Sequence, residues 1–297
     1  MQDISVIILT LNEERHIVRA ILNARKVARV VFVVDSFSTD RTVELATNLG
    51  AHVCQHRFTT HAHQLQWALD TLDITTEWVL KLDADEYMTD GLIAEIEGTL
   101  PTTPPTITGY TMPCLRKFMG REIRHGIVPL ILLRLFRMGK ARMEAKLMDE
   151  HLYVTEGTVV SLRGAFYDDS LITLAEWTAK HNGYADREAL DMLCTEYGIN
   201  DESLVHNTGA NSAKVRARKL KYIRLPLFWR CFAFFIYRYF IRLGFLDGKE
   251  GFLWHFLQGW WYRTLADAKV YELKKACHWD KNKIIQEVNR RLDAMSR

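Results

Sequence analysis

The sequence is short of cysteine, of net charge and of long hydrophobic runs, and each shortage excludes a class of protein. Its five cysteines are scattered along 297 residues, which fits neither a disulfide framework nor a zinc site of the CxxC type. A net charge of +3 gives no overall field for nucleic acid, so we expect no nucleic-acid partner. The opening segment MQDISVIILTLNEE has no basic residues ahead of its apolar run, and we expect no signal peptide. These features favour a reduced, cytoplasmic environment.

The C-terminal third contains apolar blocks that are too short to span a bilayer. Two blocks hold seven and eleven residues, 231–237 and 252–262, against the ~20 that a crossing helix needs. On a helical wheel, Arg230, Arg238 and Arg242 fall within an arc of about 120°. This pattern predicts an amphipathic helix in the membrane interface, with the arginines near anionic headgroups. The alternative is a helical subdomain that packs its aromatic side chains on the protein core or on another subunit.

The first hundred residues alternate strand and helix patterns. Apolar runs rich in β-branched residues predict strands at 4–10, 30–35, 51–54 and 77–83. Helical stretches follow them, near 13–27, 40–49, 61–72 and 90–99. Continuous apolar strands that alternate with helices indicate an α/β fold with a parallel sheet covered on both faces. Because ligands of such sheets bind at the carboxyl ends of the strands, the polar clusters TLNEE, DSFSTD and DADE should gather at one rim.

Asp83 and Asp85 end the fourth predicted strand, in EWVLKLDADEYMTDG. Carboxylates two residues apart in an extended chain point to the same side and can share one divalent cation through their oxygen atoms. Like charges this close repel, so the sequence predicts a positive partner, such as Mg²⁺ or Mn²⁺ held together with substrate phosphates. The alternative is an acidic cap on the following helix, with Asp90 as its N-cap residue.

Four segments resemble the family 2 inverting glycosyltransferases in order and spacing: SVIILTLNEE, VVFVVDSFSTDRT, HQLQWAL and WVLKLDADE. The resemblance covers roughly residues 3–170 and implies the A-type glycosyltransferase fold, a Rossmann-like sheet that binds a nucleotide-diphosphate sugar. Within the family, the chain looks most like bacterial enzymes that add sugars during lipopolysaccharide-core or exopolysaccharide assembly.

The resemblance and the composition together divide the chain into two parts. A catalytic domain is expected over 1–210, with a nucleotide-binding half at 1–100 and a half for the acceptor and the base at 101–210. The proline-rich stretch 100–110 separates these halves. A basic and aromatic composition then marks a helical region at 211–297, which we expect at the membrane interface.

The resemblance also implies which residues contact the donor and the metal. In the family, side chains at the ends of the first two strands contact the nucleotide base and ribose, and a polar residue of the HQLQWAL segment points toward the nucleotide. The matching residues are Thr10, Asn12, Glu13, Asp35, Ser38 and Gln64. Asp85 matches the principal ligand of a divalent cation, Mg²⁺ or Mn²⁺, and Asp83 contacts the ribose or the metal.

Inverting transfer also needs a carboxylate that removes the proton of the acceptor hydroxyl. The family places this base in an acidic pair, and KLMDEHLYV supplies Asp149 and Glu150. The family order is Glu-Asp, so the reversed order leaves both residues open as the base, with Asp149 our first choice. A solvated acidic turn is the alternative. Asp168 stands near the point where relatives carry a metal-binding histidine, and it is either a third metal ligand or a cap for a helix near Leu171.

The sequence therefore predicts a metal-dependent inverting hexosyltransferase with a nucleotide-diphosphate sugar donor, expected to be a UDP-sugar. Its acceptor is expected to be a lipid-linked, lipopolysaccharide or exopolysaccharide glycan, and its place the inner face of the cytoplasmic membrane, as a peripheral protein. The oligomeric state stays open, a homo-oligomer included. One alternative is a D-x-D phosphohydrolase or phosphotransferase, but that mechanism requires its aspartates after the first strand. The other is a membrane-surface scaffold, which does not require clustered carboxylates that repel one another.

Overall fold

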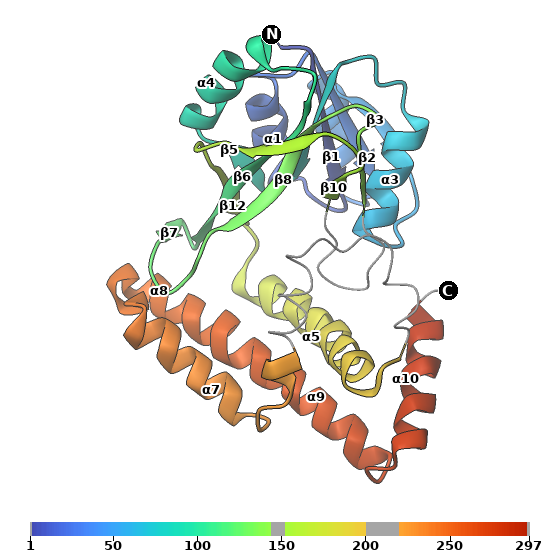
Figure 1. The fold of residues 1–297 in the computed structure, drawn as a ribbon, viewed down its shortest axis with the longest axis vertical. Helices are drawn as coiled ribbons and strands as arrows, with labels where there is room; N and C mark the ends of the chain where they lie inside the picture. The colour runs from blue at the N-terminus through green and yellow to red at the C-terminus, as the bar shows by residue number, and fades with distance from the viewer. Residues whose placement is uncertain (1, 144–151, 200–219, 296–297) are drawn as a thin grey trace. The chain divides into compact units, whose positions relative to one another are not determined.

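A computed structural model describes residues 2–143, 152–199 and 220–295, which form two compact units (Figure 1). Of the described residues, the sheet unit comprises 2–124, 128–143 and 152–172, and the helical unit comprises 125–127, 173–199 and 220–295. The domain boundary expected at 210/211 falls outside the described residues and stays a prediction. The compact units themselves divide at 172/173.

The first half of the sheet unit has the parallel arrangement that the sequence predicts. Strands lie side by side in the order β3-β2-β1-β4 and all pair in parallel: β1 (Ile4–Thr10), β2 (Val30–Asp35), β3 (His52–Gln55) and β4 (Trp78–Asp83). The helices of this half are α1 (Ile17–Ala24), α2 (Thr42–Asn48), α3 (His61–Thr71) and α4 (Asp90–Thr99), followed by the 3₁₀ turn η1 (Leu100–Thr102). The predicted order of strands and helices is therefore confirmed.

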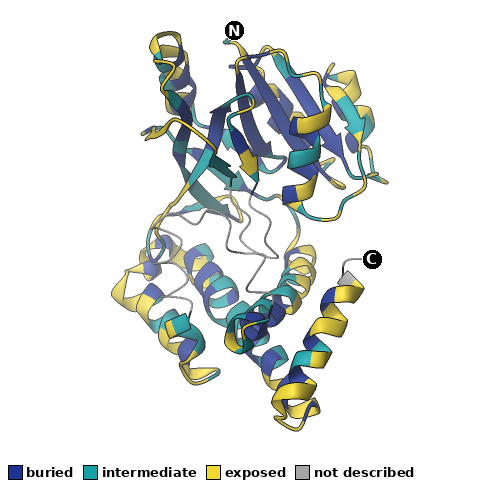
Figure 2. Cartoon of the chain, turned by 45° about the vertical axis from the view of Figure 1, so that its right-hand side comes forward, coloured by how far each residue is buried: buried dark blue, intermediate teal, exposed yellow. Residues whose placement is uncertain are grey.

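Strand β1 shows why a continuous apolar run forms the centre of this sheet. Ile4, Val6 and Ile8 pack into one core cluster, whereas Ile7 and Leu9 pack into another. Because successive side chains of a strand point to opposite faces, β1 is buried on both sides (Figure 2).

The second half makes the sheet mixed and curls it. After β4 the order continues β8-β6-β12-β5, with β7 and β11 also paired to β6, and β9 and β10 form a separate ribbon. The bounds are β5 (Glu86–Met88), β6 (Ile107–Phe118), β7 (Arg121–Ile123), β8 (Leu130–Arg137), β9 (Ala141–Met143), β10 (Leu152–Val154), β11 (Thr158–Ser161) and β12 (Phe166–Asp169). Strand β5 follows β4 after two residues, yet it lies at the far end of the strand order. The sheet must therefore curl, which returns β5 and β12 to the end of β4.

Two helix caps exclude alternative roles for acidic residues. The side chain of Thr89, not Asp90, caps α4 by accepting a hydrogen bond from the Leu92 amide at 3.2 Å. Helix α5 (Leu174–Tyr197) begins with a capping box between Thr173 and Glu176. Asp90 as an N-cap is thus wrong, and so is Asp168 as a helix cap, since Asp168 lies within strand β12.

The helical unit is built around α5, which packs with α9 and α10 on one apolar core. Its elements after α5 are α7 (Trp229–Ile236), η2 (Tyr237–Ile241), η3 (Gly244–Asp247), α8 (Gly248–Trp254), η4 (His255–Trp261), α9 (Tyr262–Ala276) and α10 (Lys281–Met295). Within the described part of the chain, none of the helices combines the length and the apolar character that a membrane crossing requires.

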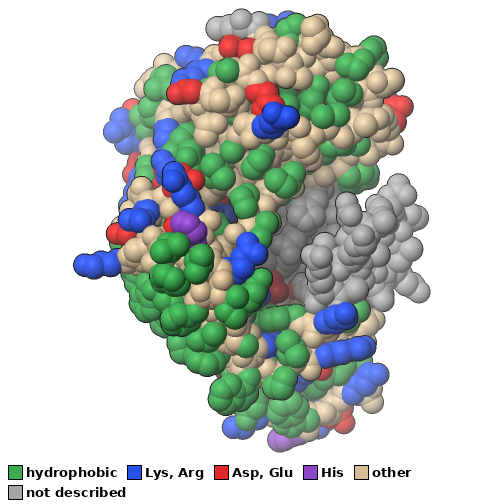
Figure 3. All heavy atoms as spheres, turned by 60° about the vertical axis from the view of Figure 1, so that its left-hand side comes forward, with side chains coloured by type: hydrophobic (Ala, Val, Ile, Leu, Met, Phe, Trp, Pro, Cys, Tyr) green, Lys and Arg blue, Asp and Glu red, His purple; other side chains and the backbone are tan. Residues whose placement is uncertain are grey.

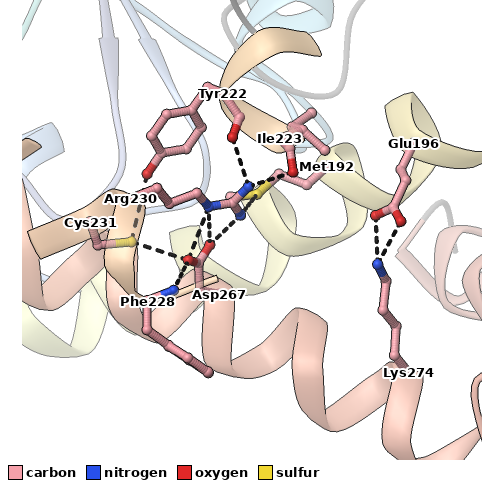
Figure 4. A network of polar contacts seen from close by, with 9 residues as sticks. All are labelled: Met192, Glu196, Tyr222, Ile223, Phe228, Arg230, Cys231, Asp267 and Lys274. Carbon is pink, nitrogen blue, oxygen red and sulfur yellow. Dashed lines mark hydrogen bonds and ion pairs between the residues drawn. The ribbon is translucent and has the colours of Figure 1, made fainter. Parts of the chain in front are cut away.

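A buried ion pair holds α7 to α9. The Arg230 guanidinium donates to the Asp267 carboxylate, and both side chains are almost fully buried (Figure 4). Asp267 also accepts from the Phe228 amide at 2.8 Å. Arg238 is buried as well, donating to the Gly126 carbonyl and the Gln258 side chain. The prediction that Arg230 and Arg238 face lipid headgroups is therefore wrong, because both side chains are buried and hydrogen-bonded inside the protein.

Asp267→Ala should lower the free energy of unfolding by about 3–5 kcal/mol, because it leaves the Arg230 guanidinium buried without its counter-charge. Chemical denaturation of the full chain measures the loss. Glu196→Ala is the matched control: it removes a more exposed pair with Lys274 in the same unit (2.6 Å, Figure 4) and should cost at most about 1 kcal/mol. Equal losses in the two variants would contradict the assigned role of the buried pair.

Candidate active site

Asp35 organises the rim where the parallel strands end. Its carboxylate, fully buried, accepts hydrogen bonds from the Thr10 hydroxyl at 3.1 Å, the Ser38 amide at 2.9 Å and the Ser38 hydroxyl. The Gln55 side chain donates to the same carboxylate at 3.4 Å. Asp35 thus fixes the loop after β2 against the end of β1.

Asn12 closes this loop from the other side. Its amide donates to the Ser38 hydroxyl at 2.8 Å, and its side-chain oxygen accepts from the Thr39 amide at 2.8 Å. Asn12 has a positive φ of 57°, a left-handed conformation that asparagine tolerates better than most residues. Four residues predicted from the sequence (Thr10, Asn12, Asp35 and Ser38) therefore form one hydrogen-bonded network.

Gln64 and Glu13 lie at the margins of the same network. Buried Gln64 donates to the Ser36 hydroxyl at 3.0 Å, and its oxygen lies 2.8 Å from His56 Nδ1. The Glu13 carboxylate lies 2.6 Å from His16 Nδ1. Gln64 is thus joined to the loop after β2, while the Glu13 side chain contacts His16, the N-cap residue of α1.

Asp83 ends β4 between two cations of the protein. Lys81 Nζ lies 2.6 Å from its carboxylate, and Arg134 Nη2 lies 3.3 Å from it. Arg134 also pairs with Glu86, which is buried at the start of β5. The positive charge that the clustered carboxylates require is therefore supplied in part by Lys81 on the same strand and by Arg134 on β8.

Burial and charge act in opposite directions on these two acids. Burial raises the pKa of the Asp83 carboxyl, but Lys81 and Arg134 outweigh it and hold that pKa far below its ordinary value. For Glu86, burial outweighs the attraction of Arg134 and raises the pKa above the ordinary value. Asp83 is the member of the pair that stays ionised.

A second charged cluster surrounds Asp85. Arg19 donates to the Asp85 carbonyl at 3.3 Å and to the Asp169 carboxylate at 2.8 Å. Arg116 pairs with Asp168, which faces Glu86 across the β12–β5 pairing. Burial lowers the pKa of Arg116, but the carboxylates of Asp168 and, more weakly, Asp85 raise it above its ordinary value. Asp85 and Asp168 therefore act on the same guanidinium.

The parallel strands and their rim coincide with a known sequence family. Residues 5–114 match the model of Glycosyl transferase family 2. The chain carries a family 2 glycosyltransferase domain. The predicted family and enzyme class are thereby confirmed: the protein is a glycosyltransferase, and its general reaction transfers a sugar from a nucleotide-sugar donor.

The similarity of this glycosyltransferase to its relatives extends beyond the matched domain. An uncharacterized glycosyltransferase of Rickettsia typhi is 27% identical over 92% of this chain and 88% of its own length. The lipopolysaccharide core biosynthesis glycosyltransferase LpsC of Rhizobium meliloti is 28% identical over 63% of this chain and 70% of its own length. The solved mannosyltransferase of Pyrobaculum calidifontis, in complex with GDP-Man and Mn²⁺, is 16% identical and covers 91% of this chain and 87% of its own, with a TM-score of 0.50. That last likeness shows the fold.

Two residues of the glycosyltransferase have side chains of the kind that binds a divalent cation. Asp83 and Asp85 offer carboxylate oxygens, the ligands that Mg²⁺ and Mn²⁺ prefer. Across residues 2–143, 152–199 and 220–295, no three or more His, Cys, Asp and Glu side chains gather as a metal site. Asp168 is paired with Arg116. A cation at Asp83 and Asp85 would therefore complete its shell with diphosphate and water oxygens, and Asp168 as a third ligand stays a prediction.

Two residues of this region were missed by sequence reasoning. Lys81 stands two positions before Asp83, on the same side of β4, so the strand period alone could have indicated the pair. Arg19 meets Asp169 across 150 positions of sequence, and no local signal indicates that contact. The predicted bases Asp149 and Glu150 lie outside the described residues.

Arg134→Met should destabilise the glycosyltransferase by about 3–5 kcal/mol near neutral pH, because it leaves Asp83 and Glu86 without a shared counter-charge. Because the pKa of Glu86 is raised in the folded protein, protonation of Glu86 stabilises the fold. This contribution to the free energy of unfolding is present at low pH and is lost as the pH rises. Without Arg134 this preference strengthens, so the deficit relative to wild type should shrink at about pH 5.

Denaturant unfolding at the two pH values measures the deficit. Arg124→Met is the control, since Arg124 pairs with Glu122 at the surface (3.1 Å) and should change stability by no more than about 1 kcal/mol. A deficit that stays constant or grows on acidification would refute the coupling.

Proposed function

We propose that the protein is an inverting hexosyltransferase that uses a divalent cation and a nucleotide-diphosphate sugar, with a UDP-sugar as donor. The observation that carries the proposal is the position of Asp83 and Asp85 at the carboxyl end of β4, in the family 2 domain whose Asp35 network forms the same rim. In open α/β sheets this edge is where nucleotides bind. The complex of the Pyrobaculum mannosyltransferase with GDP-Man and Mn²⁺ supports the cation and the class of donor.

The chemistry assigns distinct tasks to the chain's own residues. Thr10, Asn12, Glu13, Asp35, Ser38 and Gln64 are the proposed contacts of the nucleotide. Asp85, with Asp83, would hold a cation that offsets the charge developing on the diphosphate leaving group. Lys81 and Arg134 keep Asp83 ionised, and so ready to accept hydrogen bonds or a cation. Either Asp149 or Glu150 would take the proton of the acceptor hydroxyl.

The proposed acceptor is a lipid-linked or lipopolysaccharide glycan at the inner face of the cytoplasmic membrane. The likeness to LpsC, named for lipopolysaccharide core biosynthesis, supports this class of acceptor. Exopolysaccharide glycans are the second acceptor class that the sequence suggests.

Asp85→Asn should reduce the release of nucleoside diphosphate from sugar nucleotides by at least about 100-fold, since a neutral amide holds Mg²⁺ or Mn²⁺ weakly. The purified chain is assayed against a panel of sugar nucleotides with each metal and with a chelator. Asp90→Asn is the control, because Asp90 is a solvent-exposed carboxylate five residues away, paired with Lys26. An active Asp85→Asn variant, or activity that survives chelation, would overturn the metal-dependent mechanism.

Asp149→Asn should lower kcat by at least about 100-fold with little change in donor KM, as expected for loss of a general base. Glu150→Gln should lower kcat less. The ranking is read from steady-state rates with the acceptor present, alongside donor binding by calorimetry. If Glu150→Gln causes the larger loss, the base is Glu150, and if neither does, the acidic pair is a solvated turn.

A further inference from the structure

The segment from α7 to η3 exposes several aromatic side chains while two of its arginines are buried. Trp229, Phe232, Tyr237 and Phe240 are all exposed, with Trp229 73% exposed. Arg230 and Arg238, eight residues apart, are both buried. An amphipathic helix in a globular protein normally turns its apolar stripe to the core, so this stripe faces a different surrounding.

Ring contacts join the exposed rings of Phe232 and Phe240 to other aromatic side chains of the helical unit. Phe232 and Phe235 both pack on Trp260, with ring centroids 5.2 and 5.5 Å apart, and Phe235 stacks on Tyr239. Tyr239 in turn contacts Phe240 at 5.1 Å and Phe245 at 6.2 Å. Phe232, Phe240 and Phe245 are therefore linked through one continuous aromatic layer.

Exposed aliphatic side chains extend this layer. Ile241 is 67% exposed and Leu246 is 50% exposed. In Figure 3, hydrophobic side chains gather over one face of the helical unit. We call this surface the apolar stripe: Trp229, Phe232, Phe240, Ile241, Phe245 and Leu246. A contiguous exposed patch of this kind marks an interaction site.

The charges beside the stripe indicate what covers it. Lys221, Arg224, Arg242 and Lys249 are exposed, whereas Asp247 is buried and Glu250 is half-buried. A second copy seated on the same surface would bring this cationic rim against itself, which is unfavourable for a twofold interface. Anionic lipid headgroups complement the rim, and Trp, Phe and Leu side chains suit the boundary between headgroups and acyl chains.

We propose that the apolar stripe inserts into the surface of an anionic membrane while the rim of Lys and Arg binds its headgroups. The proposal deepens the membrane location of the proposed function and rests on it. Buried Arg230 and Arg238 hold the stripe in place: Arg230 ties α7 to α9 through Asp267, and Arg238 ties η2 to Gly126 and Gln258.

Flotation of the full chain with vesicles of phosphatidylcholine, with and without phosphatidylglycerol, tests the proposal. Wild type should float with anionic vesicles and be released by salt. Trp229→Ser and Ile241→Ser should each weaken binding roughly tenfold, since each removes a large apolar side chain from the lipid. Arg242→Glu should weaken binding to the anionic vesicles alone.

Trp279→Ser is the matched control. Trp279 is also an exposed tryptophan of the helical unit (56%) but stands between α9 and α10, outside the stripe. Unchanged flotation of Trp279→Ser supports the proposal, whereas an equal loss in both tryptophan variants overturns it. The proposal is also overturned if the wild type does not float. It is overturned as well if light scattering shows that Trp229→Ser dissociates an oligomer while vesicle binding stays unchanged.

An assay of sugar-nucleotide turnover in the absence of vesicles shows whether this proposal or the proposed function has failed. The Trp229→Ser and Ile241→Ser variants should retain that turnover, because their side chains belong to the helical unit, whereas the rim of the parallel strands belongs to the sheet unit. A chain that binds vesicles through the stripe but turns over no sugar nucleotide would support the lipid surface and overturn the proposed function.

Discussion

The pairing of Arg134 with Asp83 and Glu86 is the interaction on which the acidic end of the sheet depends. Three carboxylates within four residues would repel one another at the end of a buried strand. Strand β8 pairs directly with β4, and its Arg134 guanidinium reaches two of the three carboxylates. Lys81 adds a second positive charge from β4 itself. With this neutralisation in place, the chain can keep Asp83 ionised at an edge where a nucleotide-sugar donor would bring its own negative charge.

In the helical unit, too, a buried charge requires a partner of opposite charge. There Arg230 and Asp267 are buried as a matched pair that joins α7 to α9, while Trp229 and Phe232 of α7 stay exposed. A buried charge is costly unless it is paired and hydrogen-bonded, and Arg230 meets that condition through Asp267 and two backbone carbonyls. In both units, therefore, the placement of arginine decides which face of an element is available for a ligand or a surface.

Local pattern was sufficient for the parallel half of the fold and for much of the rim. The strands at Ile4–Thr10 and Val30–Asp35 are read directly from continuous apolar runs, because parallel strands are buried on both faces. Their carboxyl ends must share one edge, so Thr10 and Asp35 were expected to meet, and they lie in hydrogen-bond contact. Asp168 was placed near the metal by resemblance, but its partner Arg116 follows from the pairing of β12 with β6, which local pattern does not determine.

The sequence by itself determined the order of strands and helices, the family, and the carboxylates that end β4, because these depend on short-range periodicity and on collinear motifs. Only the tertiary structure decided which charges are paired and which face of α7 is exposed. A helical wheel places Arg230 and Arg238 on one side, but it cannot tell whether that side meets water, lipid or Asp267. The free energy of a charge depends on the partners and the solvent around it, and those are set by residues far away in sequence.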